Sequence, residues 1–148
     1  MIVPNDRLPF EQYGCGDIFK GTQQRYWINI RCDCDCVQHE DGSQDDVVLY
    51  LLEAKPLPTP QLRKSFDKTY GLLQNNPTSH ILFPVNGKAL RVKFEELNQV
   101  RIGKLNEFGV TNRFGRLTSP YVTQIRQRFA LHLQREGLPR IPNEAIPE

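Results

Sequence analysis

Asp17-Ile-Phe-Lys-Gly-Thr-Gln-Gln-Arg-Tyr-Trp-Ile-Asn-Ile-Arg31 is the stretch of sequence that decides the fold. Its two ends, residues 17–20 and 25–31, are rich in aromatic and β-branched residues, and four turn-like residues separate them. This pattern predicts a pair of neighbouring strands. The run Val47-Val-Leu-Tyr-Leu-Leu52 is continuously apolar and too short for an ordinary helix, so it predicts a central, buried strand.

Further strands are expected in the second half of the chain. Residues 81–85 and 88–94 flank Asn86-Gly87, the dipeptide best suited to a two-residue hairpin turn. The second of these segments alternates, which predicts one buried face and one wet face that carries Arg91 and Lys93. Residues 100–105 are expected to add one more strand.

Two segments have helical periodicity. Thr59-Pro60 has the form of an N-cap and first helical position, and apolar residues then recur at helical spacing as far as Asn75. The second segment starts at Thr118-Ser-Pro120 and ends before Gly137 and Pro139, which are typical stop signals. Its apolar positions are Val122, Ile125, Phe129 and Leu133.

These elements predict a single α+β domain. A chain of 148 residues is long enough for one core and short for two. We expect an irregular N-terminal arm over 1–14, one sheet or barrel domain over 15–138, and a flexible tail over 139–148. The domain is an antiparallel β structure with one inserted helix and a C-terminal amphipathic helix.

Composition limits the setting and the partners. No apolar run approaches the roughly 20 residues that a membrane span requires, so a membrane association is not expected and the cytoplasm is the default compartment. The net charge of +2 is unevenly spread. Residues 88–140 contain eleven Lys or Arg and four Glu, whereas residues 1–87 contain eight Lys or Arg and eleven Asp or Glu. This asymmetry suggests an anionic partner for the second half.

Basic and aromatic side chains supply a candidate binding surface for single-stranded nucleic acid or for an acidic protein. An ordinary solvated surface is the alternative, because the outer side of a helix carries charges in any case. The candidate binding residues are Trp27, Arg91, Lys93, Arg101, Arg113, Arg116, Arg126 and Arg128.

The cysteine-rich segment is a candidate metal site. Thiolates and imidazole are zinc ligands, and the ligand candidates are Cys32, Cys34, Cys36 and His39, with Cys15 upstream. Against zinc, alternate residues of an extended strand lie too far apart to chelate unless the chain turns. The other interpretation is that the cysteines pack as small apolar side chains. No other cofactor is expected.

Glu53-Ala-Lys55 matches the Glu-x-Lys part of a pattern found in metal-dependent nucleases. That chemistry also needs an upstream carboxylate, and Asp33 or Asp35 would have to provide it. If strands 25–35 and 47–55 form a hairpin, these aspartates lie at its loop end, far from Glu53, and cannot share a metal with it.

The order of short motifs resembles that of the PemK/MazF-like toxin family. The residues that carry the resemblance are Gly16-Asp-Ile-Phe19, Arg25-Tyr-Trp-Ile-Asn-Ile30, the apolar strand 47–52, Leu97-Asn-Gln-Val-Arg-Ile102 and Gly115-Arg-Leu117 before a final helix. The resemblance implies an SH3-like β-barrel and a homodimer that cleaves single-stranded RNA. It assigns a catalytic role to Arg25 and places a catalytic threonine near Glu53-Ala54, where this chain has no hydroxyl.

We therefore expect a non-catalytic interaction or regulatory module of a prokaryotic toxin–antitoxin or phage-defence type system. Its partner would be single-stranded nucleic acid or a protein encoded nearby. An endoribonuclease that uses Arg25 and a small zinc protein are the alternatives.

Overall fold

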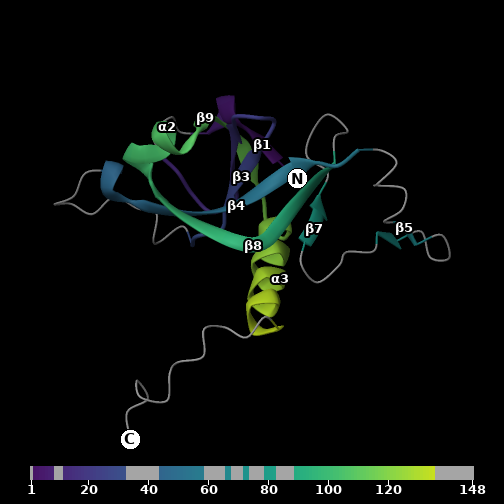
Figure 1. Ribbon diagram of the computed structural model, residues 1–148. Coiled ribbons are helices and arrows are strands. Elements are labelled where there is room, and N and C mark those ends of the chain that lie inside the picture. Colours follow the sequence, from purple (N-terminus) through teal and green to yellow (C-terminus); the bar gives the residue numbers. More distant parts are fainter. Residues whose placement is uncertain are drawn as a thin grey trace, which may run out of the picture.

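The chain folds around a curled antiparallel sheet, seen in a computed structural model that describes residues 2–8, 12–32, 44–58, 66–67, 72–73, 79–82 and 89–135. Seven strands in the order β1-β9-β2-β3-β4-β8-β7 form half a barrel, and helices lie against it (Figure 1). The predicted α+β class is confirmed. The strands are β1 (Ile2–Pro4), β2 (Asp17–Gly21), β3 (Tyr26–Asn29), β4 (Val48–Pro56), β7 (Ser79–Leu82), β8 (Leu90–Arg101) and β9 (Val110–Leu117).

Residues 17–31 form the strand pair that their composition predicts. β2 and β3 are antiparallel neighbours, with Ile18 opposite Ile28. β4 lies between β3 and β8, and Leu49, Leu51 and Leu52 on it are fully buried. Its continuous apolar run therefore reflects burial on both faces of the sheet.

β7 and β8 in the second half of the chain are antiparallel neighbours, as expected. Leu82 is opposite Leu90, one residue out of the register that a two-residue turn at Asn86-Gly87 requires, and residues 83–88 lie outside the described residues. Leu90, Val92 and Phe94 are buried, whereas Arg91 and Lys93 between them are half-buried. The expected alternation of the two faces is confirmed.

Two predictions of secondary structure are wrong. Within the expected helix 60–75, the described residues are the short strands β5 (Phe66–Asp67) and β6 (Leu72–Leu73), and the remainder lies outside the description. Phe66 is opposite Leu73 in the register of this antiparallel pair, so positions with an apparent helical period lie on strands instead.

The expected strand over 100–105 is the second error. β8 ends at Arg101, and the chain continues as the 3₁₀ turn η4 (Ile102–Lys104) and the short helix α2 (Leu105–Phe108). Gly109 ends α2 in a left-handed conformation, with φ at 106°. The 3₁₀ turns η1 (Asn5–Arg7) and η3 (Gln44–Asp46) complete the list of helical turns in the described parts.

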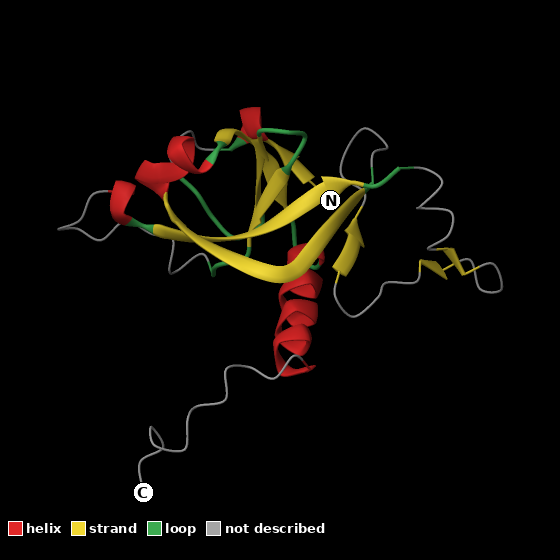
Figure 2. Cartoon of the chain, viewed as in Figure 1, coloured by secondary structure: helices red, strands yellow, loops and turns green. Residues whose placement is uncertain are grey.

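The C-terminal helix is confirmed as α3 (Tyr121–Arg135) and covers one face of the sheet (Figure 2). Its Val122, Ile125 and Phe129 pack into a core with alternate residues of the strands, such as Ile28 and Leu52. No helix within the described ranges is long and apolar enough to cross a membrane.

The opposite face of the sheet has its own core. The intervening residues of the same strands, among them Phe19, Trp27 and Leu51, pack there with Leu105 of α2. Trp27 lies edge-on to Phe108, with 4.7 Å between the ring centroids. Both faces of the middle strands are therefore buried.

The N-terminal segment belongs to the sheet, although the three residues of β1, which end in Pro4, are too few to show a strand pattern in the sequence. β1 pairs with β9, and Gly115 on β9 faces Pro4. A buried ion-pair cluster holds this region: Asp17 lies between Arg116 and Arg113, which also donate hydrogen bonds to the carbonyl oxygen of Gln12. The boundaries of the predicted domain stay a prediction.

Candidate functional site

A bulge in β8 interrupts the ladder between β4 and β8. Ala54 is paired with Val92, whereas Leu52 is paired with Leu97. Four residues of β8, 93–96, therefore lie opposite the single residue Glu53. Bulges bend a strand and redirect side chains, and they are common beside functional sites.

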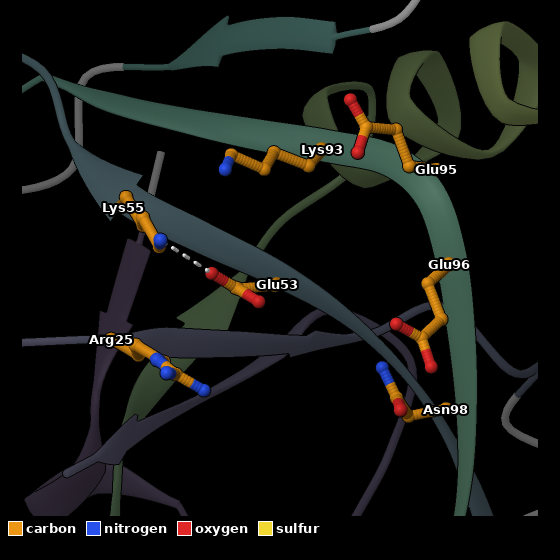
Figure 3. A pocket seen from close by; sticks show the side chains of 7 residues that line it. All are labelled: Arg25, Glu53, Lys55, Lys93, Glu95, Glu96 and Asn98. Atoms are coloured by element: carbon orange, nitrogen blue, oxygen red, sulfur yellow. Dashed lines mark ion pairs between the residues drawn. The ribbon is translucent and has the colours of Figure 1, made fainter. Parts of the chain in front are cut away.

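The bulge opens a polar pocket of about 380 Å³, which we call the bulge pocket. Figure 3 shows its side chains, which come from the start of β3, from β4 and from β8. Lys55 and Glu53 form an ion pair across 3.4 Å. Three cations, three carboxylates and one amide line the pocket: Arg25, Lys55, Lys93, Glu53, Glu95, Glu96 and Asn98.

The three cations lie toward one end of the pocket, where Glu53 also pairs with Lys55. Tyr26 is opposite Ala54, so Arg25 lies level with Lys55. On the other side of β4, Val92 is opposite Ala54, and Lys93 is the next residue along β8. Asn98 lies level with Leu51, about 13 Å along β4 at about 3.3 Å per residue. Figure 3 agrees, with the three cations on one side and Glu96 and Asn98 on the other.

Arg91 lies beside the cationic side chains of the pocket. It is directly opposite Lys55, and residues that face each other across two strands point to the same side of the sheet. The Nε atom of Arg91 is buried and has no hydrogen-bond partner among the described residues. A cationic stripe thus continues from the pocket along β8.

Two of the predicted site residues meet in this pocket. Arg25 was expected from a family resemblance and Lys93 from the alternation of a strand, and both line it. Arg25 is half-buried, and its Nη2 donates a hydrogen bond of 2.8 Å to Oε1 of Gln23. Glu53 and Lys55 of the Glu-x-Lys motif are there as well, whereas Asp33 and Asp35 lie outside the described residues.

Other predicted site residues have structural roles. Trp27 is only 6% exposed and lies in the core, so no base can stack on it in this conformation. Arg113, 7% exposed, and the half-buried Arg116 are directed at Asp17. The guanidinium of Arg113 is thus buried against a carboxylate, and that of Arg116 is partly occupied by the same carboxylate.

The remaining basic candidates lie apart from the pocket. Arg128 on α3 is in hydrogen-bond contact with His80 Nδ1 at 2.7 Å and lies over the ring of Phe94. Arg101, at the end of β8, and Arg126, on the outer side of α3, are exposed. The eight predicted binding residues therefore do not form one continuous face.

The pKa of His80 is clearly displaced from its ordinary value. Burial lowers the pKa of His80 from 6.5 to about 4, and the positive charge of Arg128 adds to the effect. The imidazole is neutral at pH 7, so its Nδ1 accepts the hydrogen bond from Arg128. This contact joins the edge strand β7 to α3.

The zinc prediction stays a prediction. Cys15 and Cys32 are half-buried, and Cys34, Cys36 and His39 lie outside the described residues. Within the ranges that the structure covers, no group of three or more His, Cys, Asp or Glu side chains is placed to hold a metal ion.

The sequence contains a signal for the bulge that pattern reading missed. Buried residues follow a period of two at Leu90, Val92 and Phe94, and the next residue packed against the same core is Leu97, three positions further. A slip of phase inside a strand indicates extra residues. Glu95 and Glu96 occupy that slip and line the pocket.

Comparisons of the chain with models of known protein families, with characterised proteins and with solved structures found no match. The bulge pocket must therefore be interpreted from its own chemistry.

Proposed function

We propose that this chain is a non-catalytic module that binds single-stranded nucleic acid through the bulge pocket. One observation carries the proposal: Arg25, Lys55 and Lys93 converge from three strands on a pocket that is open to solvent, and Arg91 continues the cationic stripe. Lys and Arg bind phosphate groups by charge and hydrogen bonding. Lys55 and Lys93 lie on sheet strands and Arg25 directly precedes β3, so the backbone positions of the cations are fixed before a ligand arrives.

The mixture of charges favours nucleic acid over an acidic protein. An acidic polypeptide would meet Glu53, Glu95 and Glu96 as like charges in the same pocket that offers the cations. A nucleotide carries an anionic phosphate and, at a distance from it, a base with hydrogen-bond donors. Its two ends therefore match the separated cations and carboxylates of the pocket.

The finer features of the proposal rest on the resemblance to PemK/MazF-like proteins. They are an SH3-like barrel, a homodimer, and a role in a toxin–antitoxin or phage-defence type system. A seven-stranded half-barrel with a C-terminal helix is compatible with such a barrel. The pocket residues have no hydroxyl where the resemblance expects a threonine, and this supports binding without cleavage.

The test is the fluorescence anisotropy of labelled single-stranded RNA and DNA oligonucleotides titrated with purified protein at low and moderate salt. We expect binding that weakens with salt, and a loss of about tenfold or more in the double variant Arg25→Ala, Lys93→Ala. Arg126→Ala is the matched control, because Arg126 is exposed and remote from the pocket. Equal affinity of the double variant and the control contradicts the proposal.

A second candidate is an endoribonuclease, and the position of Arg25 beside Glu53 favours it. Both side chains line the pocket, and Glu53 lies opposite Trp27, two residues after Arg25. A carboxylate can deprotonate a ribose hydroxyl and a guanidinium can stabilise charge on the phosphate. Incubation with end-labelled RNA decides between the candidates: cleavage that Arg25→Ala abolishes supports the nuclease, and intact RNA supports the module.

A further inference from the structure

We infer that the bulge pocket is selective for guanine, read by Glu96 and Asn98 at its acidic end. This inference rests on the proposed binding of single-stranded nucleic acid and names the base at that site. Its starting point is the distance along β4 between the cations, which lie near Lys55, and the amide of Asn98, which lies level with Leu51.

Glu96 and Asn98 are presented together because of the bulge. Leu97, between them, is paired with Leu52 and packs against the α3 core. Successive side chains of a strand point to opposite faces, so Glu96 and Asn98 both point away from that core. Figure 3 shows the two side chains next to each other at the end of the pocket away from the lysines.

A carboxylate beside an amide matches the edge of guanine. Guanine presents two adjacent donors, N1–H and the N2 amino group, next to the acceptor O6. The two oxygens of Glu96 can accept both donors, while the amide of Asn98 donates to O6.

The other bases fit this pair less well. Uracil has a single N–H donor between two carbonyl acceptors. Cytosine and adenine place a ring-nitrogen acceptor beside their amino group, where it meets the lone pairs of the carboxylate. A site built on hydrogen bonds rejects ligands that leave its groups unpaired.

Stacking on an aromatic ring does not account for recognition of a base in this pocket. Among its described lining residues there is no aromatic side chain, and stacking discriminates poorly between bases in any case. Hydrogen bonding must therefore supply the selectivity, while Arg25, Lys55 and Lys93 hold the phosphate on the other side.

The experiment measures the affinity of the full chain for oligo(U) strands that carry one central guanine, inosine, adenine or cytosine, beside oligo(U) itself. We expect the guanine strand to bind about tenfold more tightly than oligo(U). Inosine lacks the N2 amino group and should fall between them. Glu96→Gln should remove most of the guanine preference while its affinity for oligo(U) is unchanged or higher.

Glu107→Gln is the matched control, since Glu107 is an exposed carboxylate on α2, outside the pocket. It should keep the full preference for guanine. If every strand binds with the same affinity, or if Glu96→Gln keeps the preference, the assignment of guanine is overturned and the proposed function stands. If no strand binds at low salt, both are overturned.

Discussion

Arg116 donates a hydrogen bond through Nε to Oδ1 of Asp17, a carboxylate that is completely buried. Oδ2 of Asp17 accepts a second hydrogen bond from the backbone N–H of Gly14 at 2.8 Å. Arg113 approaches the same oxygen to 3.6 Å. One carboxylate thus joins β2, β9 and the segment before β2.

Replacement of this carboxylate should be costly. Asp17→Asn keeps the size of the side chain but leaves Arg113 and Arg116 without their counter-charge, and removal of one partner from a buried pair typically costs about 3–5 kcal/mol. The free energy of unfolding from urea denaturation measures the loss. Glu107→Gln breaks the exposed pair with Lys104 and should cost less than about 1 kcal/mol. Similar values for both variants would show that the Asp17 cluster does not stabilise the fold.

Gly16 should tolerate no side chain. Its φ is 90°, and a Cβ there would lie 2.3 Å from the carbonyl oxygen of Leu117. Gly109 has a similar φ of 106°, but a Cβ would come only to 3.4 Å from the side chain of Thr22. We expect Gly109→Ala to cost about 1 kcal/mol and Gly16→Ala about 3 kcal/mol or more, because backbone strain and a backbone clash add there. Thermal unfolding of both variants tests this order.

His80 should make the fold sensitive to mild acid. Its pKa is about 4 in the folded chain against 6.5 when unperturbed, so between these values the unfolded chain takes up a proton that the folded chain does not. The contribution of His80 to stability is therefore complete above pH 6.5 and is lost as the pH falls toward 4. Partial exposure of the ring moderates its size.

The measurement for His80 is the midpoint of urea denaturation at pH 7.5 and at pH 5.0. His80→Gln cannot take up the proton, and its amide oxygen can still accept from Arg128. This variant should lose less stability between the two pH values than the natural chain. An equal loss would assign the sensitivity to acid to other groups.

Glu53 should oppose ligand binding. Its carboxylate pairs with Lys55 and adds negative charge at the centre of the pocket. Glu53→Gln should therefore tighten the binding of a single strand a few-fold, because Lys55 becomes free to contact a phosphate. The slope of log K against log salt should become steeper by up to about 0.7. Weaker binding by this variant would mean that Glu53 contacts the ligand directly. If the chain is a nuclease, the same variant should bind RNA and leave it intact.

The sheet was predictable from sequence where one physical rule dominates. Composition and alternation identify β2, β3, β4 and the pairing of β7 with β8, because burial of one or both faces imposes those patterns directly. The C-terminal helix has both a start signal and stop signals. By contrast, Phe66 and Leu73 are spaced for a helix and yet lie opposite each other in two antiparallel strands, which no local pattern distinguishes.

The site was only partly predictable. A basic side chain on a strand indicates exposure, but it does not reveal a buried counter-charge elsewhere in the chain, and Arg113 and Arg116 are bound to Asp17 for that reason. The convergence of Arg25 with Lys93 depends on the order of strands and on the register. Trp27 looks suitable for stacking in the sequence, and only the second core shows that it is committed to packing.

The bulge in β8 separates part of the pocket from the ladder that holds the sheet together. Deletion of residues 95–97 would set Phe94 opposite Leu52 and leave Asn98 opposite Leu51, so the ladder with β4 would close without a gap. Glu95 and Glu96 thus lie in an insert that the ladder does not need, whereas the other pocket residues lie outside it. An engineer could exchange that insert for another sequence of the same length and give the half-barrel a different specificity.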